Sequence, residues 1–436
     1  MWTYHPDLLA QPVPRYTSYP TAADFGELEE GTIERAIAGA VGDVSLYLHI
    51  PFCEKICFYC GCNTGASGKR ARVETYLAAL HQELATVASL LPQGAQVRRI
   101  AFGGGSPNAI EPQEFLALVD ALHAHFPLYD PEWSIELDPR SLTPEWSHVA
   151  RTAGITRASM GVQTFAPHCQ KAIGREQSTA MICRSIDWLR SGGVTSLNFD
   201  LMYGLPQQTA EDLAESLEYT RKLGADRVAV FGYAHVPHLV PRQTMIPEDA
   251  LPGAEARFAM AGQAHDVLTG HGYEAIGFDH FALPHDSMAK VTRAGALRRN
   301  FQGFTDDPAD VLIGMGSSAI SGFPGLFAQN DKHNGRYRTL SAEGRLSANH
   351  GFARSAEDAL RGGVIEALLC RSEADLPARL LGEVQERLAP FTARGLAKLS
   401  GSRLQITHDG LPYARVIASL FDAYRAVTQR RFSSAI

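Results

Sequence analysis

The sequence predicts an α/β fold in which helices cover a parallel sheet. Three observations support this prediction. Between residues 45 and 231, six short apolar runs alternate with segments of helical periodicity. Strands and helices that alternate form parallel sheets, because each helix returns the chain to the start of the next strand. Motifs rich in glycine, cysteine and charged residues follow the strands, and a parallel barrel carries its chemistry on the loops at that end.

The predicted elements of the first half follow one another at regular intervals. Strands are expected at residues 45–50, 97–102, 133–137, 157–162, 196–203 and 227–231. The clearest helix has apolar residues at helical spacing, namely Leu77, Leu80, Leu84, Val87 and Leu91. Further helices are expected at 112–126, 178–191 and 209–223. Ser178 and Thr209 are good N-caps for the last two of these helices.

The ends of the chain have a different pattern. After residue 232 the sequence predicts a helix at 252–272, a strand at 273–278 and a loop-rich stretch to about residue 325. Beyond about residue 350, helices are expected at 355–370, 381–395 and 411–429, with a short strand at 403–407. At the other end, Pro14–Ala22 is bracketed by prolines and is expected to be extended or turn-like rather than helical.

Composition excludes several classes of protein. The chain has 436 residues, of which 45% are hydrophobic, so it can bury a sizeable core. A net charge of -7 disfavours a nucleic-acid partner, because nucleic-acid binders are usually basic. No run of 18 or more apolar residues predicts a membrane span, and the N-terminus does not have the pattern of a signal peptide. We therefore expect a cytoplasmic protein whose thiols stay reduced.

The loop after the first strand contains four of the 7 cysteines. Cys53, Cys57 and Cys60 have the spacing C-x3-C-x2-C, which lets three thiolates each ligate one iron of an iron–sulfur cube and leaves the fourth iron open. A disulfide is disfavoured because nothing else in the sequence looks secreted. Structural zinc is the better alternative, but it usually needs four ligands or two separated pairs. The pattern therefore favours an iron–sulfur cluster.

At these cysteines the sequence resembles the radical S-adenosylmethionine superfamily, and with Cys62 and its flanks it resembles the oxygen-independent coproporphyrinogen III oxidases. The resemblance continues from Pro14 to Ser434. It implies a partial (β/α)6 barrel and a [4Fe-4S] cluster on Cys53, Cys57 and Cys60, with S-adenosyl-L-methionine bound beside it. The expected parts are an N-terminal arm at 1–43, the barrel with a C-terminal extension at 44–325, and a mostly helical C-terminal domain at 350–436.

The strand-end motifs match the positions that bind S-adenosylmethionine in the superfamily. Each motif taken alone is more often structural: a glycine turn, an ion pair, a buried amide or a core tyrosine. Their succession along the sheet in the family's order supports the functional interpretation. The resemblance carries this binding role to Tyr47, to Tyr59 through its backbone, and to Gly104, Gly105, Ser106, Glu136, Gln163, Arg175, Asp200 and Ala234. Ser106 stands where the family usually has threonine, which also carries a hydroxyl.

The resemblance also implies a second S-adenosylmethionine molecule, held by Gln302 and, more weakly, by Phe301 and Ile320. Cys62 matches a family cysteine that is not a cluster ligand. His235 and His280 could donate to a propionate or relay a proton, although structural histidines explain them equally well. Arg15 is a candidate for binding a substrate carboxylate.

The implied activity is the oxidative decarboxylation of two propionates of coproporphyrinogen III to vinyl groups, giving protoporphyrinogen IX through a 5′-deoxyadenosyl radical. An external electron donor and acceptor are expected partners, and the protein is expected to be a monomer. A haem chaperone on the same barrel and a radical methyltransferase that opens the haem ring remain alternatives, and a zinc-binding module is a more distant one. Cys62, the Pro14–Ala22 segment and residues 299–305 argue against the chaperone.

Overall fold

In the computed structural model of the chain, residues 2–425 are described. Six parallel strands form the centre of its main sheet, paired in the order in which they occur along the chain. These strands are β2 (Gly42–Ile50), β5 (Ala95–Gly104), β6 (Leu128–Leu137), β7 (Ile155–Gln163), β8 (Ser196–Tyr203) and β9 (Arg227–Gly232). All six predicted strands are confirmed, and the sheet does not close into a full ring.

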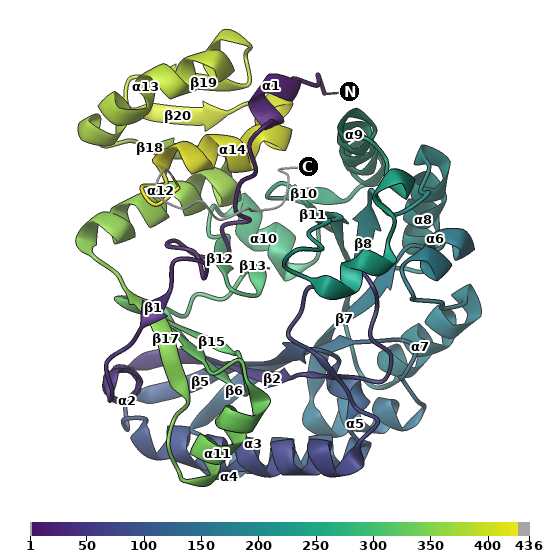
Figure 1. The fold of residues 1–436 in the computed structure, drawn as a ribbon, viewed down its shortest axis with the longest axis vertical. Coiled ribbons are helices and arrows are strands. Elements are labelled where there is room, and N and C mark those ends of the chain that lie inside the picture. The colour runs from purple at the N-terminus through teal and green to yellow at the C-terminus, as the bar shows by residue number, and fades with distance from the viewer. Residues whose placement is uncertain (1, 426–436) are drawn as a thin grey trace.

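Helices cover the outer face of this sheet (Figure 1). They are α3 (Arg70–Leu90), α4 (Pro112–His125), α5 (Glu145–Ala153), α6 (Pro167–Ala172), α7 (Thr179–Ser191) and α8 (Ala210–Lys222). The four predicted helices and both predicted caps are confirmed: Ser178 accepts a hydrogen bond from the Met181 backbone, and Thr209 accepts one from Asp212. The sequence did not predict α5 and α6. Both helices are short, so they contain too few apolar residues to show helical periodicity.

The main sheet continues beyond the six strands at both edges. β14 (Val311–Met315) pairs in parallel with β2, and a series of antiparallel strands extends from it. That series is β15 (Ile320–Phe323), β16 (Leu326–Asn330), β17 (Ala348–Ala353) and β1 (Gly26–Glu27), and the opposite edge carries β11 (His280–Ala282) and β10 (Glu274–Ile276). Helices α9 (Ala254–Gly270) and α11 (Asn334–Ala342) belong to these extensions. The helix predicted at 252–272 is confirmed as α9, while the predicted strand at 273–278 is shortened to β10.

The prediction of a loop-rich stretch up to residue 325 is wrong. This stretch of the chain contains α10 (Ser287–Arg293), the hairpin strands β12 (Arg298–Asn300) and β13 (Gly303–Thr305), and the strands β14 and β15. Each strand here has three to five residues, which is too short for an alternating pattern to stand out in the sequence. Their order comes from pairing with distant segments, such as Val311 with Val44.

The C-terminal part contains α12 (Ala356–Arg371), α13 (Ala378–Ala393), α14 (Ala414–Ala418) and a small sheet. That sheet has the strand order β18 (Glu373–Asp375), β20 (Arg403–Ile406), β19 (Ala397–Ser400). The helix predicted at 411–429 is wrong over its described part, which is mostly 3-10 turns around the short α14; its last four residues lie outside the described residues. The division into domains stays a prediction, and one hydrophobic core contains both Leu46 of the barrel and Val384 of α13.

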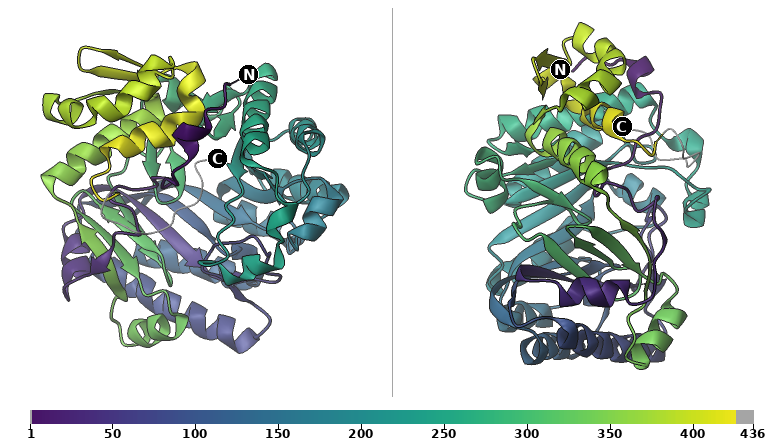
Figure 2. Two further views of the ribbon diagram at one scale, coloured as in Figure 1. Left: turned by 45° about the horizontal axis from the view of Figure 1, so that its top comes forward. Right: turned by 90° about the vertical axis from the view of Figure 1, so that its left-hand side faces the viewer.

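The N-terminal arm runs between the C-terminal part and the edge of the main sheet (Figures 1 and 2). It contains α1 (Pro6–Leu9) and α2 (Thr32–Ala38), while Pro14–Ala22 forms neither helix nor strand, as predicted. The Tyr16 hydroxyl donates to Asp422 at 2.8 Å, which ties the arm to the C-terminal part. Among residues 2–425, no helix is long and apolar enough to cross a membrane.

Candidate functional site

A cavity of about 340 Å³ lies at the C-terminal ends of the parallel strands. Twelve residues singled out from the sequence line it together: Arg15, Cys53, Cys57, Tyr59, Cys60, Cys62, Gly104, Gly105, Glu136, Gln163, Arg175 and Asp200. Most come from the loop after β2 and from the ends of β5, β6, β7 and β8, while Arg175 lies between α6 and α7 and Arg15 on the N-terminal arm. The carboxyl ends of parallel strands meet at one edge, which explains why residues far apart in sequence converge there.

The cysteine loop is held directly against the glycine turn after β5. Gly105 donates to the Ile50 carbonyl at 2.9 Å, and Ser106 donates to the Phe52 carbonyl at 2.8 Å. A Cβ on Gly105 would lie 2.5 Å from the Phe52 oxygen, so a side chain does not fit there. Two short strands, β3 (Phe52–Cys53) and β4 (Gly65–Ala66), pair in parallel and close the loop. The glycine is therefore required by the close approach of two backbones.

The environment of Cys57 fits a metal-binding thiolate. Its Sγ accepts hydrogen bonds from Arg140 Nη2 at 3.2 Å and from Arg175 Nη1 at 3.4 Å. Two guanidinium groups stabilise negative charge on sulfur, and ligating thiolates are deprotonated. A hydrogen bond with Cys62 lowers the pKa of Cys60 to about 6, while burial raises the pKa of Cys53 to about 12. The three free cysteines on one cavity, with cations beside them, fit an iron–sulfur cluster.

Asp138 and Arg140 support this site, although the sequence analysis did not single them out. Asp138 accepts from Arg140 Nη2 at 2.7 Å and from Arg175 Nη1 at 3.1 Å. Arg140 Nη2 also donates to the Lys55 carbonyl at 3.0 Å, which anchors the cysteine loop. The signal was present, because both residues follow Glu136 at the end of the third strand. Their partners became visible only in the structure.

Arg175 is largely occupied within the protein. Besides Asp138 and Cys57, it donates to the Gly161 carbonyl, from Nε at 3.1 Å and from Nη2 at 2.6 Å. It lines the cavity, but the edge formed by Nε and Nη2, which could bind a ligand carboxylate in two-point contact, is engaged by the backbone. In this structure the guanidinium therefore contributes charge and supports the loop more than it offers free donors.

Glu136 and Asp200 place two carboxyl groups in the cavity. Burial, followed by the charge of Asp200, raises the pKa of Glu136 to about 7, and the Gly104 backbone donates to it at 3.3 Å. Burial also raises the pKa of Asp200, whose oxygens accept from Ser159 at 2.9 Å and from Asn198 at 2.8 Å. Carboxylates held in this way can accept hydrogen bonds from the hydroxyls of a ligand.

Other predicted residues stand at or near the wall. Gln163 adopts a φ of 66°, an uncommon conformation for a non-glycine residue and one that is often found at functional sites. The Tyr47 hydroxyl lies 3.1 Å from His49 Nδ1, and burial and the charges of Glu136 and Cys62 raise the pKa of Tyr47. The Ala234 and Tyr59 carbonyls both accept from Gln243 Nε2, at 3.0 and 2.8 Å. Gln243 thus ties two loops of the site together.

Ser106 lies outside the lining of this cavity. Its hydroxyl donates to Asn108 and accepts from the Asp138 backbone at 3.1 Å, and the side chain is buried. In this arrangement Ser106 supports the turn that carries Asp138. The histidines considered from sequence are both bonded to a neighbour: His235 Nδ1 to the Tyr233 hydroxyl at 2.9 Å, and His280 Nδ1 to Asp279 at 2.6 Å.

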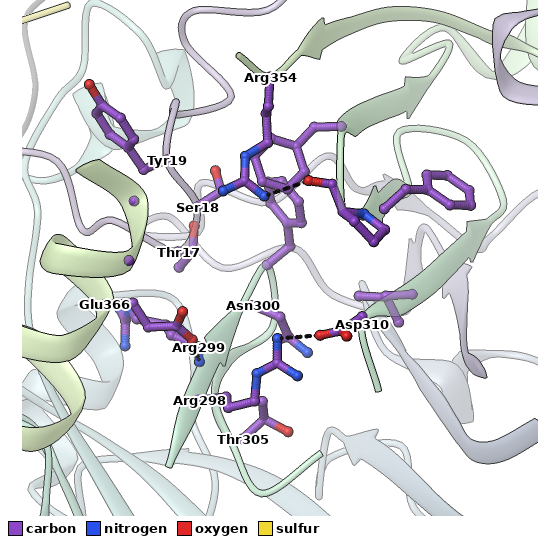
Figure 3. Close-up of a pocket in the computed structure, with 18 of the residues that line it drawn as sticks. Thr17, Ser18, Tyr19, Arg298, Arg299, Asn300, Thr305, Asp310, Arg354 and Glu366 are labelled. Carbon is purple, nitrogen blue, oxygen red and sulfur yellow. Dashed lines mark hydrogen bonds and ion pairs between the residues drawn. The ribbon is translucent and has the colours of Figure 1, made fainter. Parts of the chain in front are cut away.

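The residues predicted for a second ligand do not share one cavity. Phe301 lines a separate cavity of about 250 Å³ between the arm, the β12–β13 hairpin and α12 (Figure 3). Gln302 lines another cavity of about 160 Å³, which also reaches Glu136. Ile320 lies at the start of β15. The hairpin turns Phe301 and Gln302 to opposite sides, and a second binding site stays a prediction.

Comparison with known proteins gives three concordant results. A model of the radical SAM superfamily matches residues 47–220. The chain is 42% identical to the oxygen-independent coproporphyrinogen III oxidase of Paracoccus denitrificans over 94% of each chain, and 37% identical to that of Salmonella typhimurium over 97% of this chain and 96% of the relative. Coproporphyrinogen III oxidase (HemN) from Escherichia coli, a solved structure, superposes with a TM-score of 0.91 at 36% identity over 97% of this chain and 99% of that chain.

Proposed function

Because this chain belongs to the radical SAM superfamily, and within it to the oxygen-independent coproporphyrinogen III oxidases, we propose that the cavity beside the cysteine loop is its active site. The enzyme decarboxylates two propionate side chains of coproporphyrinogen III oxidatively to vinyl groups, giving protoporphyrinogen IX in haem biosynthesis. The observation that carries the proposed site is the convergence of three cysteines and of successive strand-end residues on one cavity.

Cys53, Cys57 and Cys60 hold the [4Fe-4S] cluster in this proposal. The cluster and S-adenosyl-L-methionine, when bound, supply the 5′-deoxyadenosyl radical that removes a hydrogen atom from the carbon β to a propionate carboxylate. Arg140 and Arg175 stabilise the Cys57 thiolate, and Asp138 keeps both guanidiniums in place. No protein side chain can remove an unactivated hydrogen by acid–base chemistry, so the protein's own residues bind, orient and exclude water.

The strand ends orient the S-adenosylmethionine molecule in this proposal. Glu136 and Asp200 accept hydrogen bonds from its hydroxyls, and Gly104 and Gly105 let their backbones approach it. The remaining residues that we assign to the first molecule are Tyr47, Tyr59, Ser106, Gln163, Arg175 and Ala234. Of these, Arg175 contributes its charge and Ser106 supports the neighbouring turn, because the polar groups of both side chains are engaged within the protein. A second molecule is assigned to Phe301, Gln302 and Ile320, of which Gln302 shares a cavity with Glu136.

The surroundings of the reaction are also proposals. An external donor supplies the electron that starts turnover, and an external acceptor takes the electron released with each CO2. We place the enzyme in the cytoplasm, because its exposed and half-buried cysteines are free thiols and an iron–sulfur cluster is sensitive to oxidation. We also propose that the enzyme acts as a monomer.

The test is an anaerobic assay of the reconstituted protein with coproporphyrinogen III, S-adenosylmethionine, a strong reductant and an acceptor source. Wild type should form 5′-deoxyadenosine and release two CO2 per porphyrinogen, whereas Cys53→Ser should lose iron and both products. Cys183→Ser on α7, outside the cavity, is the matched control and should keep both.

Three results would contradict the proposal. Transfer of bound haem without decarboxylation would indicate a chaperone. Methyl transfer with opening of the haem ring would indicate a methyltransferase. Colourless protein after anaerobic reconstitution would indicate a zinc site instead of a cluster.

A further inference from the structure

Arg15 brings a positive charge from the N-terminal arm to the wall of the active-site cavity. Its guanidinium donates to the Gly232 carbonyl at 3.1 Å and lies 5.5 Å from the centre of the Phe231 ring, both at the end of β9. Arg15 lines the 340 Å³ cavity and also a small adjacent cavity of about 60 Å³ that contains Arg415 and Asp279. The arm thus completes the wall beside the strand ends.

Arg299 of β12 holds the backbone of the arm at this point. Its Nε donates to the Tyr16 carbonyl at 2.9 Å, and its Nη2 donates to the Arg15 carbonyl at 3.0 Å. Its guanidinium packs 4.3 Å from the centre of the Phe304 ring. The third nitrogen, Nη1, is buried and has no hydrogen-bond partner among residues 2–425. Two hydrogen bonds from one rigid fork to successive carbonyls fix the position of Arg15.

Within the described part of the chain, Arg15 has no acidic partner. No carboxylate oxygen of residues 2–425 lies within 4.0 Å of the Arg15 or Arg299 guanidinium. The other two arginines of the cavity, Arg140 and Arg175, both pair with Asp138. Lys55 on the exposed cysteine loop also lines the cavity, but a single hydrogen bond from Arg140 holds its backbone carbonyl, whereas Arg299 holds the arm beside Arg15 with two.

The acidic groups nearest to this pair are already engaged. Glu366 of α12 accepts from the backbone N–H of Arg299 at 2.9 Å rather than from its guanidinium, and Figure 3 shows the two side chains together. Asp279 binds His280 at 2.6 Å. The neighbouring Arg298, in contrast, is paired with Asp310 at 2.9 Å. Burial, followed by the charge of Arg15, lowers the pKa of Arg415 to about 10.

We propose that Arg15 binds a propionate carboxylate that the porphyrinogen keeps, and that Arg299 is the residue that positions Arg15. This inference rests on the proposed function of the cavity. The substrate brings four carboxylates and the product retains two. A guanidinium pairs well with a carboxylate in two-point contact. Such a pair would oppose the loss of CO2, because it stabilises the carboxylate before reaction more than the transition state in which its charge disappears. A retained propionate is therefore the better partner for Arg15.

The experiment is a binding measurement on the reconstituted enzyme with two stable porphyrins. One is the oxidised form of the substrate with four free carboxylates, and the other carries methyl esters on the two propionates that the product keeps. Wild type should bind the diester at least about 10-fold more weakly than the free acid, since loss of one charged hydrogen-bonded pair costs at least about 1.4 kcal/mol. Arg15→Gln should bind both porphyrins at the weaker level, and Arg15→Lys should recover part of the difference.

Arg299→Gln should reduce the preference for the free acid in the same way, and the double variant should lose little more than either single one. Arg184→Gln on the exposed surface of α7 is the matched control and should bind like wild type. Equal affinity of wild type for the acid and the diester would overturn the proposal. So would a loss at Arg15→Gln that is equally large for both porphyrins, because that points to a change of fold.

Turnover separates this inference from the proposed function. In the same preparations KM for coproporphyrinogen III should rise in Arg15→Gln and Arg299→Gln, while Arg184→Gln should keep the wild-type KM. If wild type releases no CO2 from the porphyrinogen, the proposed function fails. If wild type turns over normally and both variants keep its KM and its preference for the free acid, only the role of Arg15 fails.

Discussion

At the scale of single residues, the site is a set of charges that line one cavity and have selected partners. Cys57 has two guanidinium neighbours, Asp138 balances both of them, and Glu136 has no cation as a direct partner among residues 2–425. The two guanidinium groups favour the thiolate form of Cys57. Burial disfavours the charged form of a carboxyl group, so the same cavity favours the protonated form of Glu136.

Glu136 makes the stability of the ligand-free protein depend on pH. Its folded pKa of about 7 lies above the ordinary value of 4.5, so the folded state binds more protons than the unfolded state between these values. Stability should therefore fall as pH rises from about 4.5 to about 7 on account of this group. We expect Glu136→Gln to raise the midpoint of thermal unfolding at pH 8 and to leave it nearly unchanged at pH 5.

The check is thermal unfolding of wild type and Glu136→Gln, followed by circular dichroism at several pH values. Glu211→Gln serves as control, because this side chain is exposed at the start of α8. A gain in Glu136→Gln that is the same at pH 5 and pH 8 would refute an ionisation effect.

At the scale of elements, the loop after β2 and the turn after β5 form one unit. The backbone bonds from Gly105 to Ile50 and from Ser106 to Phe52 place the cysteines above the strand ends. On the outer side, Glu83 of α3 accepts from Tyr337 of α11 at 2.6 Å and from the Gly316 backbone at 2.7 Å, so the helix holds the sheet extension in place. Single polar groups thus align elements that hydrophobic packing alone would leave free to slide.

Gly105→Ala should displace the cysteine loop. Its Cβ would lie 2.5 Å from the Phe52 oxygen, a backbone atom that cannot rotate away. We expect a loss of about 1–3 kcal/mol in the free energy of unfolding and a clear loss of bound iron after reconstitution. Both are measurable by denaturant unfolding and by iron analysis.

Gly363→Ala on α12 is the matched control for that substitution. A Cβ there meets nothing within 4 Å, and alanine is favoured over glycine in helices. The control should retain iron and be at least as stable as wild type. Iron retention in Gly105→Ala equal to that of the control would show that the loop tolerates a side chain at this turn.

At the scale of the whole molecule, the arm links distant parts of the chain. It reaches the C-terminal part through Tyr16 and Asp422, reaches the hairpin through Arg299, and pairs with the far edge of the main sheet through β1 and β17. These contacts join residues separated by as many as 406 positions in the sequence. The closed wall of the cavity is therefore a property of the complete chain.

Tyr16→Phe should loosen the arm without changing the barrel. Removing the hydroxyl leaves the buried Asp422 carboxylate without this donor, which costs about 1–3 kcal/mol. We expect faster tryptic cleavage after Arg15, followed by mass spectrometry of the fragments. Tyr129→Phe, at an exposed tyrosine, should be cleaved at the wild-type rate. Equal rates in all three proteins would show that the hydroxyl does not hold the arm.

Local sequence patterns were sufficient to predict the parallel strands of the barrel and most of the residues that line the cavity at their ends. Alternating apolar runs and helical spacing predicted the six parallel strands, and residues at consecutive strand ends must meet at one edge of such a sheet. The cysteine spacing required no tertiary information, because all three proposed ligands lie on one loop. The resemblance to a family assigned the chemistry, which periodicity could not do.

Only the tertiary structure decided what depends on distant pairing. The short strands β12 to β16 carry too little periodicity to be recognised alone, and they become ordered by pairing with each other or with β2. The partners of Cys57 and the meeting of Arg15 with Arg299 join segments that nothing in the local sequence connects. Local propensity acts over a few residues, whereas these contacts depend on how the whole chain packs, and that is why only the fold could reveal them.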